Sequence, residues 1–70
     1  MPRNVICLGR NIGRLRKAAG LTQEALAERA DISTRYVQFL EADKYAPSLL
    51  VAARLRRALG CSWDELGKFG

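Results

Sequence analysis

Turn-forming residues recur along this sequence at short intervals, and this spacing limits the elements that the chain can form. The turn signals are Gly20, residues 31–33, residues 45–48 and residues 60–62. The segments between them have room for only a few helical turns each or for short strands. Because the whole sequence has 70 residues, it forms one domain with one small core.

Apolar residues in these segments repeat at the spacing of a helix. In the first segment, Leu8, Ile12, Leu15 and Ala19 follow the i, i+4, i+7, i+11 pattern of one helix face. The inner faces expected in the later segments are Leu26, Ala27 and Ala30, then Val37 and Leu40, then Leu49, Ala52, Leu55 and Leu59. No segment alternates like a strand, so we expect helices at residues 8–19, 22–30, 33–41, 48–59 and 62–66, after a loose arm of residues 1–6.

The ends of the expected helices carry matching signals. Thr22, Ser33 and Pro47-Ser48 stand where N-caps or first helical residues belong, and Gly20 and Gly60 stand where a C-terminal glycine belongs. Ser62 and Glu65 form a complete capping box for a short last helix that ends before Gly67. The sequence therefore predicts an all-α fold, a compact five-helix bundle, in a single domain over residues 1–70 with its core in residues 8–66.

The charge balance narrows the classes of function. A formal net charge of +5 and a pI near 9.9 suit a nucleic acid, an anionic surface or an acidic protein as partner, and they also serve solubility. The sequence has no His and no readable acidic pair, so we expect no enzyme, no metal site and no cofactor. Cys7 and Cys61 are interpreted as small core residues. The sequence shows no membrane-length apolar run and no secretory h-region, which favours a cytoplasmic protein without membrane contact.

The join between the second and third expected helices is the most informative segment. Only residues 31–33 separate the two helices, with Ala27 on the inner face of one helix and Val37 and Leu40 on the inner face of the other. A close crossing needs a small residue such as Ala27, and the turn needs a residue that tolerates positive φ, which Asp31 can supply. This is a helix-turn-helix arrangement, which presents its second helix to the major groove of DNA.

At this point the sequence resembles a known family. The residues that carry the resemblance are Leu8-Gly9, Ile12, Leu15-Arg16, Gly20 to Glu24, Leu26-Ala27, Ile32-Ser33, Leu40-Glu41, Pro47-Ser48-Leu49 and Ala58-Leu59-Gly60. In this order and spacing, over about residues 8 to 66, they are similar to the Cro/phage-repressor (XRE) helix-turn-helix domains. The resemblance implies a lambda-repressor-like fold and sequence-specific binding to double-stranded DNA, usually as a dimer on an inverted repeat, to regulate transcription. Small members include phage repressors, restriction–modification controllers and antitoxins.

The resemblance also implies roles for individual residues, with the helix after Ser33 as the recognition helix. The expected base contacts come from Thr34, Arg35, Gln38 and Phe39. The expected phosphate contacts come from Gln23, Thr22, Ser33, Tyr36, Lys44 and Arg16. Arg35 can bridge the O6 and N7 atoms of guanine, and Gln38 can read adenine. Arg16 and Glu41 match a structural ion pair of the family.

Some positions depart from the family pattern. Phe39 replaces a polar or basic residue, and it either touches a thymine methyl group or packs against a partner or a neighbouring helix. Asp31 and Asp43 stand where glycine is common and add negative charge near the expected DNA surface. Arg56 replaces a small residue and either snorkels to the surface or marks a changed interface.

Two surfaces remain open to more than one interpretation. Arg10, Arg14 and Lys17 form either a solvated face of the first helix or a set of phosphate contacts. Trp63, Leu66 and Phe69 follow one side of the last helix and the tail, where part of that side covers the core and the remainder is expected to form a homodimer interface. No small-molecule ligand is evident.

The main alternative to a DNA-binding regulator, a repressor or controller, is an adaptor that uses a helix-turn-helix fold for protein–protein contacts, like an antitoxin or a co-regulator. DNA binding should weaken steeply with salt, whereas an adaptor should bind its partner through a salt-tolerant apolar surface.

Overall fold

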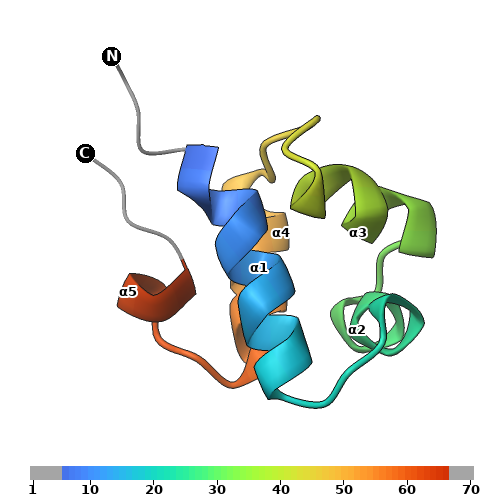
Figure 1. The fold of residues 1–70 in the computed structure, drawn as a ribbon, viewed down its shortest axis with the longest axis vertical. Coiled ribbons are helices and arrows are strands. Elements are labelled where there is room, and N and C mark those ends of the chain that lie inside the picture. The colour runs from blue at the N-terminus through green and yellow to red at the C-terminus, as the bar shows by residue number, and fades with distance from the viewer. Residues whose placement is uncertain (1–5, 67–70) are drawn as a thin grey trace.

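Five helices account for most of residues 6–66, the part of the chain whose backbone the computed structural model describes; side chains are described from residue 9 (Figure 1). They are α1 (Ile6–Ala18), α2 (Gln23–Ala30), α3 (Thr34–Glu41), α4 (Leu49–Leu59) and α5 (Trp63–Leu66). The described residues contain no strand. The prediction of an all-α fold of five helices is confirmed for the described residues.

The predicted capping residues begin their helices. The side-chain oxygens of Thr22, Ser33 and Ser48 each accept a hydrogen bond from the backbone N–H three residues later, at 3.0, 3.0 and 3.2 Å. Ser62 and Glu65 exchange two hydrogen bonds of 2.8 and 3.1 Å, which is the predicted capping box. These bonds satisfy amides that a helix start leaves unpaired, so local sequence sets where each helix begins.

The core lies where the five helices meet. Its largest fully buried side chains are Ile12 of α1, Leu26 of α2, Val37 and Leu40 of α3, Leu55 of α4 and Leu66 of α5. Burying one such side chain contributes about 1.5–3 kcal/mol, so a domain this small depends on every member of the set.

The helices are arranged so that α3 occupies one side of the molecule. In Figure 1, α1 and α4 run through the middle, α2 and α3 lie together on one side, and α5 lies on the other. The packing partners of α3 are α1 and α2. The outward side of α3 is therefore left open to a ligand, and α5 does not cover it.

The turn between α2 and α3 has the predicted conformation. Asp31 adopts a left-handed conformation with φ 60° and ψ 47°, and its N–H bonds back to the carbonyl oxygens of Ala27 and Glu28. Ala27 is only 2% exposed, as a close crossing of the two helices requires. The three-residue turn thus holds α3 at a fixed angle to α2.

Three details of the helix assignments were wrong. Residue 6, expected in a loose arm, is the first residue of α1, and residues 1–5 and 67–70 lie outside the described part. Ala19, expected on the inner face of the first helix, is exposed and follows the end of α1. Leu49, expected on the inner face of α4, is 78% exposed because it lies in the first turn, beyond the reach of the core.

Candidate nucleic-acid interface

The outward side of α3 carries the four predicted base-contacting residues. Arg35 and Gln38 are exposed, and Thr34 and Phe39 are half-buried. Their positions i, i+1, i+4 and i+5 form one face, opposite the buried Val37 and Leu40 of the core. The structure therefore presents a guanidinium, an amide, a hydroxyl and an aromatic ring together on one short helix.

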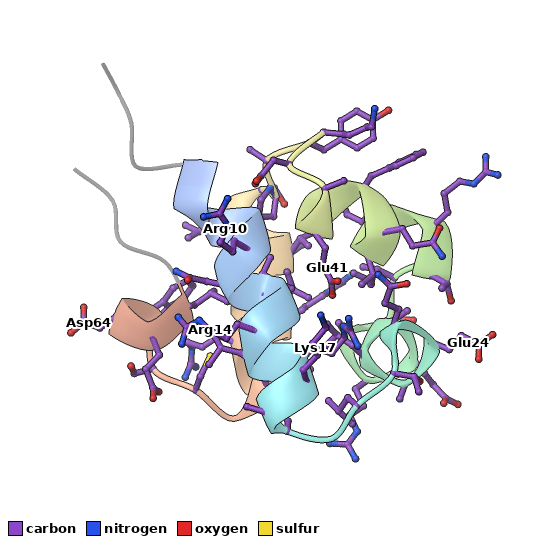
Figure 2. The ribbon with its side chains drawn as sticks, viewed as in Figure 1. Arg10, Arg14, Lys17, Glu24, Glu41 and Asp64 are labelled. Carbon is purple, nitrogen blue, oxygen red and sulfur yellow. The ribbon has the colours of Figure 1, made fainter. Side chains whose placement is uncertain are left out.

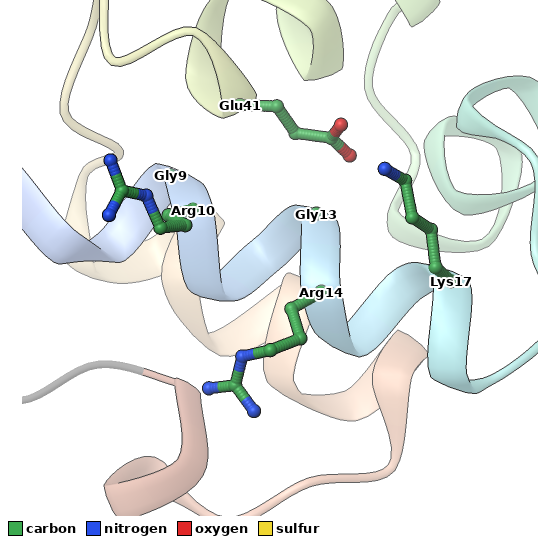
Figure 3. A pocket seen from close by; sticks show the side chains of 6 residues that line it. All are labelled: Gly9, Arg10, Gly13, Arg14, Lys17 and Glu41. Atoms are coloured by element: carbon green, nitrogen blue, oxygen red, sulfur yellow. The ribbon is translucent and has the colours of Figure 1, made fainter.

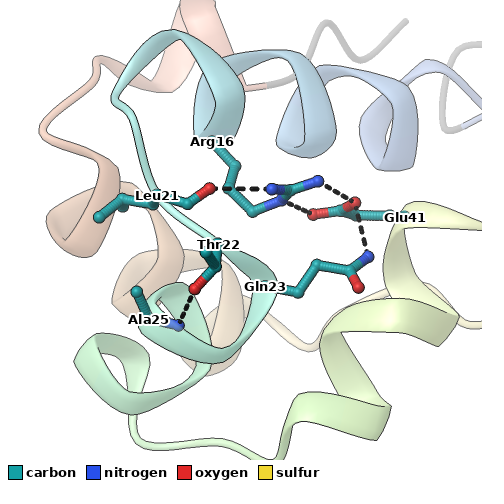
Figure 4. A network of polar contacts seen from close by, with 6 residues as sticks. All are labelled: Arg16, Leu21, Thr22, Gln23, Ala25 and Glu41. Atoms are coloured by element: carbon teal, nitrogen blue, oxygen red, sulfur yellow. Dashed lines mark hydrogen bonds and ion pairs between the residues drawn. The ribbon is translucent and has the colours of Figure 1, made fainter.

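Beneath α3, a polar network joins three helices (Figure 4). Arg16 of α1 donates from Nε to Oε2 of Glu41 at 2.6 Å and from Nη2 to Oε1 at 3.2 Å. Gln23, the first residue of α2, donates from Nε2 to the same Oε1 at 3.1 Å. The structure thus brings together the predicted ion pair and adds Gln23, which the sequence analysis did not connect to it.

The hydrogen bonds of this network determine which of its side chains remain available to a ligand. The side chains of Arg16 and Glu41 are only 11% and 13% exposed, and Nη1 of Arg16 also donates to the carbonyl oxygen of Leu21 at 2.9 Å. Arg16 therefore positions its neighbours and offers little charge to a phosphate, contrary to the predicted phosphate contact. Gln23 keeps its amide oxygen and one N–H free at the start of α2, where the helix dipole favours an anion.

The other predicted phosphate-contacting residues lie at the edges of this surface. Thr22, Ser33 and Lys44 are exposed. The hydroxyl oxygens of Thr22 and Ser33 accept capping bonds, so each O–H group remains free to donate to a phosphate oxygen. Tyr36 is half-buried against the core, and only part of its ring remains accessible.

Aromatic rings cover the C-terminal half of α3. Tyr45, from the turn between α3 and α4, packs its ring edge-on against Phe39, with centroids 5.3 Å apart and an interplanar angle of 79°. The same ring lies 6.3 Å from Tyr36. Tyr45 remains 56% exposed. From the sequence, Tyr45 was predicted only as part of a turn. Its position six residues after Phe39 was the one signal in the sequence that its ring could fold back onto α3.

Asp43 has a role that the sequence analysis missed. It adopts φ 61°, and its Oδ1 accepts a hydrogen bond of 3.1 Å from the backbone N–H of Gly9 in the first turn of α1. A carboxylate at a helix start is stabilised by the helix dipole. The charge of Asp43 therefore anchors α1 to the turn after α3, in addition to lying near the expected DNA surface.

Basic side chains also line a shallow pocket on α1. Its volume is about 380 Å³, and its lining residues are Gly9, Arg10, Gly13, Arg14, Lys17 and Glu41. Figure 3 shows Lys17 directed toward the carboxylate of Glu41 and Arg14 directed away toward α5. Nη2 of Arg14 donates to Asn11 at 2.9 Å. The three cations lie along α1 (Figure 2), where they suit either solvent or an anion.

Near α5, the predicted dimer residues separate into different environments. Trp63 is 42% exposed, and the guanidinium of Arg56 lies 5.4 Å from its ring centroid. Leu66 is 1% exposed and belongs to the core, so its side chain offers no surface to a partner. Phe69 lies outside the described residues. Arg56 packs at the junction of α4 and α5, where Nη1 donates to the carbonyl oxygen of Cys61 at 3.4 Å.

Within residues 6–66, the structure contains neither a cluster of metal-ligating side chains nor a membrane-length helix. No group of three or more Cys, Asp or Glu side chains there could hold a metal ion. No helix in that range is long and apolar enough to cross a membrane.

Burial, together with the nearby carboxylate of Glu65, raises the pKa of the Cys61 thiol.

Comparison with known proteins extends these observations. A model of the helix-turn-helix family HTH_3 matches residues 12–66. A stretch of 45 residues is 51% identical to an uncharacterized HTH-type transcriptional regulator of Methanothermobacter thermautotrophicus, covering 64% of this chain and 65% of that protein. The chain thus aligns with slightly less than two thirds of that relative.

Two solved structures share the arrangement of helices. The restriction–modification controller protein C.AhdI from Aeromonas hydrophila superposes with a TM-score of 0.83 and 32% identity, over 89% of this chain and 94% of the controller. The P22 c2 repressor, solved in complex with a synthetic operator, superposes with a TM-score of 0.79 and 29% identity, over 84% of this chain and 89% of the repressor.

Proposed function

This chain belongs to the HTH_3 helix-turn-helix family of DNA-binding transcriptional regulators, and from that premise we propose that it acts as a homodimeric repressor or controller on an inverted-repeat operator. The observation that carries the proposal is the open face of α3, on which Arg35 and Gln38 are exposed. The same proposal places the protein in the cytoplasm, with double-stranded DNA as its partner and no cofactor.

In the proposed complex, α3 lies in the major groove. Arg35 donates two hydrogen bonds to guanine O6 and N7, and Gln38 pairs with N6 and N7 of an adenine within its reach. Gln23 and the hydroxyls of Thr22 and Ser33 bind backbone phosphates, and Lys44 adds a cation at the far end of α3. The Glu41 network holds Gln23 in place, so backbone contacts and base contacts keep one register.

A dimer is proposed because one α3 reads too little sequence. Its eight residues span about 12 Å, or roughly four base pairs. A second α3 about 34 Å away in the next major groove doubles the site and accounts for an inverted repeat. We place the interface at the α5 end, around the half-exposed Trp63, because this end lies across the molecule from α3 (Figure 1).

Salt dependence tests the DNA-binding proposal. The logarithm of the binding constant should fall linearly with the logarithm of salt concentration, by about 0.9 for each phosphate contact. Lys44→Ala should reduce this slope by about one per protomer, and Gln23→Ala should weaken binding to all sequences alike. Arg57→Ala on α4 is the matched control, since it removes a cation outside the α3 surface. A binding constant that does not change with salt contradicts the proposal.

Sedimentation equilibrium tests the dimer. The wild-type chain should form a single dimeric species, and Trp63→Ala should shift it toward monomer. Leu50→Ala removes an even more exposed apolar side chain, at 63% against 42% for Trp63, from the start of α4 and should leave the dimer intact. A wild-type monomer at high concentration, or equal effects of the two variants, contradicts the placement of the interface.

The second candidate is an adaptor that binds another protein. The observation that favours it is the exposure of Leu49 and Leu50, at 78% and 63%, a few positions after the exposed Tyr45 in the sequence. Such a partner would bind through apolar contacts that are insensitive to salt. Leu49→Ala and Leu50→Ala would then be more damaging than Arg35→Ala, which is the reverse of the order expected for operator binding.

A further inference from the structure

The aromatic group at the end of α3 gives the proposed recognition surface an unusual chemistry. Phe39 lies one helical turn after Arg35 on the outward side of α3, and Tyr45 packs against it from the following turn. Phe39 is half-buried and Tyr45 is 56% exposed, so the pair forms an apolar surface that remains partly open. We call Phe39 and Tyr45 the aromatic pair.

The aromatic pair cannot take part in the hydrogen-bond readout of base edges through its rings. A phenyl ring has no donor and no acceptor, so it cannot distinguish bases by the donor and acceptor pattern of the groove. The apolar group that a duplex displays in its major groove is the methyl group on C5 of thymine. A methyl group stands at the same position in 5-methylcytosine.

The surroundings of the aromatic pair favour DNA over an apolar protein as the group that covers it. Arg35 and Gln38 are exposed on the same helix face as Phe39, and the exposed Lys44 directly precedes Tyr45, which gives the pair a cationic and polar rim. A rim of this kind suits a phosphate backbone and base edges. The pair is also continuous with the proposed base-reading face of α3, so any duplex that Arg35 contacts must pass beside it.

The spacing along α3 fixes where the contact falls. Residues i and i+4 are separated by about 6 Å along a helix axis, which corresponds to about two base-pair steps. Resting on the proposed function, we propose that the aromatic pair reads the C5-methyl group of a pyrimidine about two steps from the guanine bound by Arg35. Phe39 supplies the contact, and Tyr45 fixes the Phe39 ring and widens the surface.

The test uses methyl groups added and removed one at a time. After an operator has been selected from random duplexes, each thymine is replaced by deoxyuridine, which lacks the methyl group, and each cytosine by 5-methylcytosine. If the source is thymine, deoxyuridine at the contacted position should weaken binding by about fourfold for each half-site in which it is placed, and the other replacements should have little effect. If the source is 5-methylcytosine, one methylated position per half-site should strengthen binding by a similar factor.

Protein variants connect the effect to the aromatic pair. Phe39→Leu keeps an apolar side chain and should keep the methyl dependence, whereas Phe39→Gln should abolish it while the duplex still binds. Tyr45→Ala changes an exposed residue outside the core and should reduce the dependence without unfolding the domain. Leu49→Ala, at another exposed apolar side chain, is the control that should change nothing.

The outcomes separate this inference from the function on which it rests. An operator whose binding is indifferent to every methyl replacement overturns the inference and leaves the proposed function standing. A methyl dependence that persists unchanged in Phe39→Gln and Tyr45→Ala also overturns it. A selection that enriches no sequence overturns both.

Discussion

Glu41 is the residue on which the geometry of the recognition surface depends most. Its carboxylate receives Arg16 from α1 and Gln23 from α2, although it belongs to the last turn of α3. One side chain therefore fixes the three helices that a duplex would meet. Because the pair is largely buried, removing one partner leaves the other without compensation, and this costs more than the pair itself contributes.

We expect Glu41→Ala to lower the free energy of unfolding by about 3 kcal/mol. Urea denaturation followed by circular dichroism measures this change. The control is Glu28→Ala, at an exposed position of α2, which should change the free energy of unfolding by less than about 0.5 kcal/mol. Equal stabilities of the two variants would show that the network carries no structural role.

Gly9 and Gly13 lie on the same helix but meet different surroundings. A Cβ at Gly9 would collide with the backbone carbonyl oxygen of Leu40 and with the carboxylate of Asp43. A Cβ at Gly13 would meet only the side chain of Glu41, at 3.3 Å. Gly9 is therefore required by the close approach of α1 to the end of α3, and Gly13 is not.

Alanine should be tolerated at Gly13 and destabilising at Gly9. Replacing a helix-interior glycine by alanine contributes about 1 kcal/mol of helix propensity at either site. At Gly13 this gain offsets the small steric cost, so Gly13→Ala should change the unfolding free energy by less than about 1 kcal/mol. Gly9→Ala should lower it by more than about 2 kcal/mol. Thermal melts compare the two directly, and a Gly9→Ala domain as stable as wild type would contradict the close approach.

Cys61 makes the free energy of unfolding depend on pH in the alkaline range. Burial raises the pKa of its thiol above the value in the unfolded chain, so the folded state favours the neutral form. This contribution is complete below the unfolded pKa and is lost as pH rises through the folded pKa. The urea midpoint of the wild-type chain should therefore fall more between pH 8 and pH 11, roughly, than that of Cys61→Ala. Parallel pH profiles would contradict the burial of the thiol.

At the scale of elements, the turn between α2 and α3 contains a residue in a strained backbone conformation directly before the proposed recognition helix. Asp31 holds φ 60°, a conformation that costs a non-glycine residue about 1 kcal/mol, and no hydrogen bond of its carboxylate offsets this cost within the described part of the chain. The turn nevertheless sets the angle between α2 and α3.

Asp31→Gly should therefore raise the free energy of unfolding by about 0.5–1 kcal/mol. The same change removes a negative charge next to the start of α3, so DNA affinity should rise at low salt. Asp31→Val, which tolerates positive φ poorly, should destabilise the domain. Chemical denaturation of the three proteins gives the order Gly, Asp, Val if the turn is as described, and any other order contradicts it.

The elements predicted well from sequence are those fixed by local chemistry. The caps at Thr22 and Ser33 and the left-handed residue at Asp31 depend on neighbours within a few positions, so a linear pattern contains the necessary information. The contacts of Asp43 with Gly9 and of Gln23 with Glu41 join residues far apart in the chain. Neither leaves a periodic signal: the first follows from the packing of α1 against α3, and the second from the packing of α2 against α3.

The sequence also did not indicate which apolar side chains would be exposed in the folded domain. Leu49 and Leu66 look alike in a helical pattern, but one is 78% exposed and the other 1%. The difference arises because Leu49 lies in the first turn of α4, outside the core, while the short α5 turns Leu66 inward beneath α1. A periodicity argument assigns faces of a helix, but it does not say how far along the helix the core extends.

At the scale of the whole molecule, the fold separates the surface proposed for DNA from the surface proposed for assembly. α3 and α5, the helix that begins at the half-exposed Trp63, lie on opposite sides of the central pair of α1 and α4 (Figure 1). This geometry allows a dimer joined near α5 to present two recognition helices without either surface covering the other.

Parallel selection from random duplexes, with the wild-type chain and with Arg35→Ala, tests the central claim most directly. If α3 enters the major groove as described, the wild-type chain should enrich an inverted repeat with a fixed guanine in each half-site. Arg35→Ala should enrich the same repeat with that guanine no longer preferred, because the bidentate contact carries about 1–3 kcal/mol of discrimination. Recovery of the same guanine by both proteins, or no enrichment by the wild-type chain, would contradict the account.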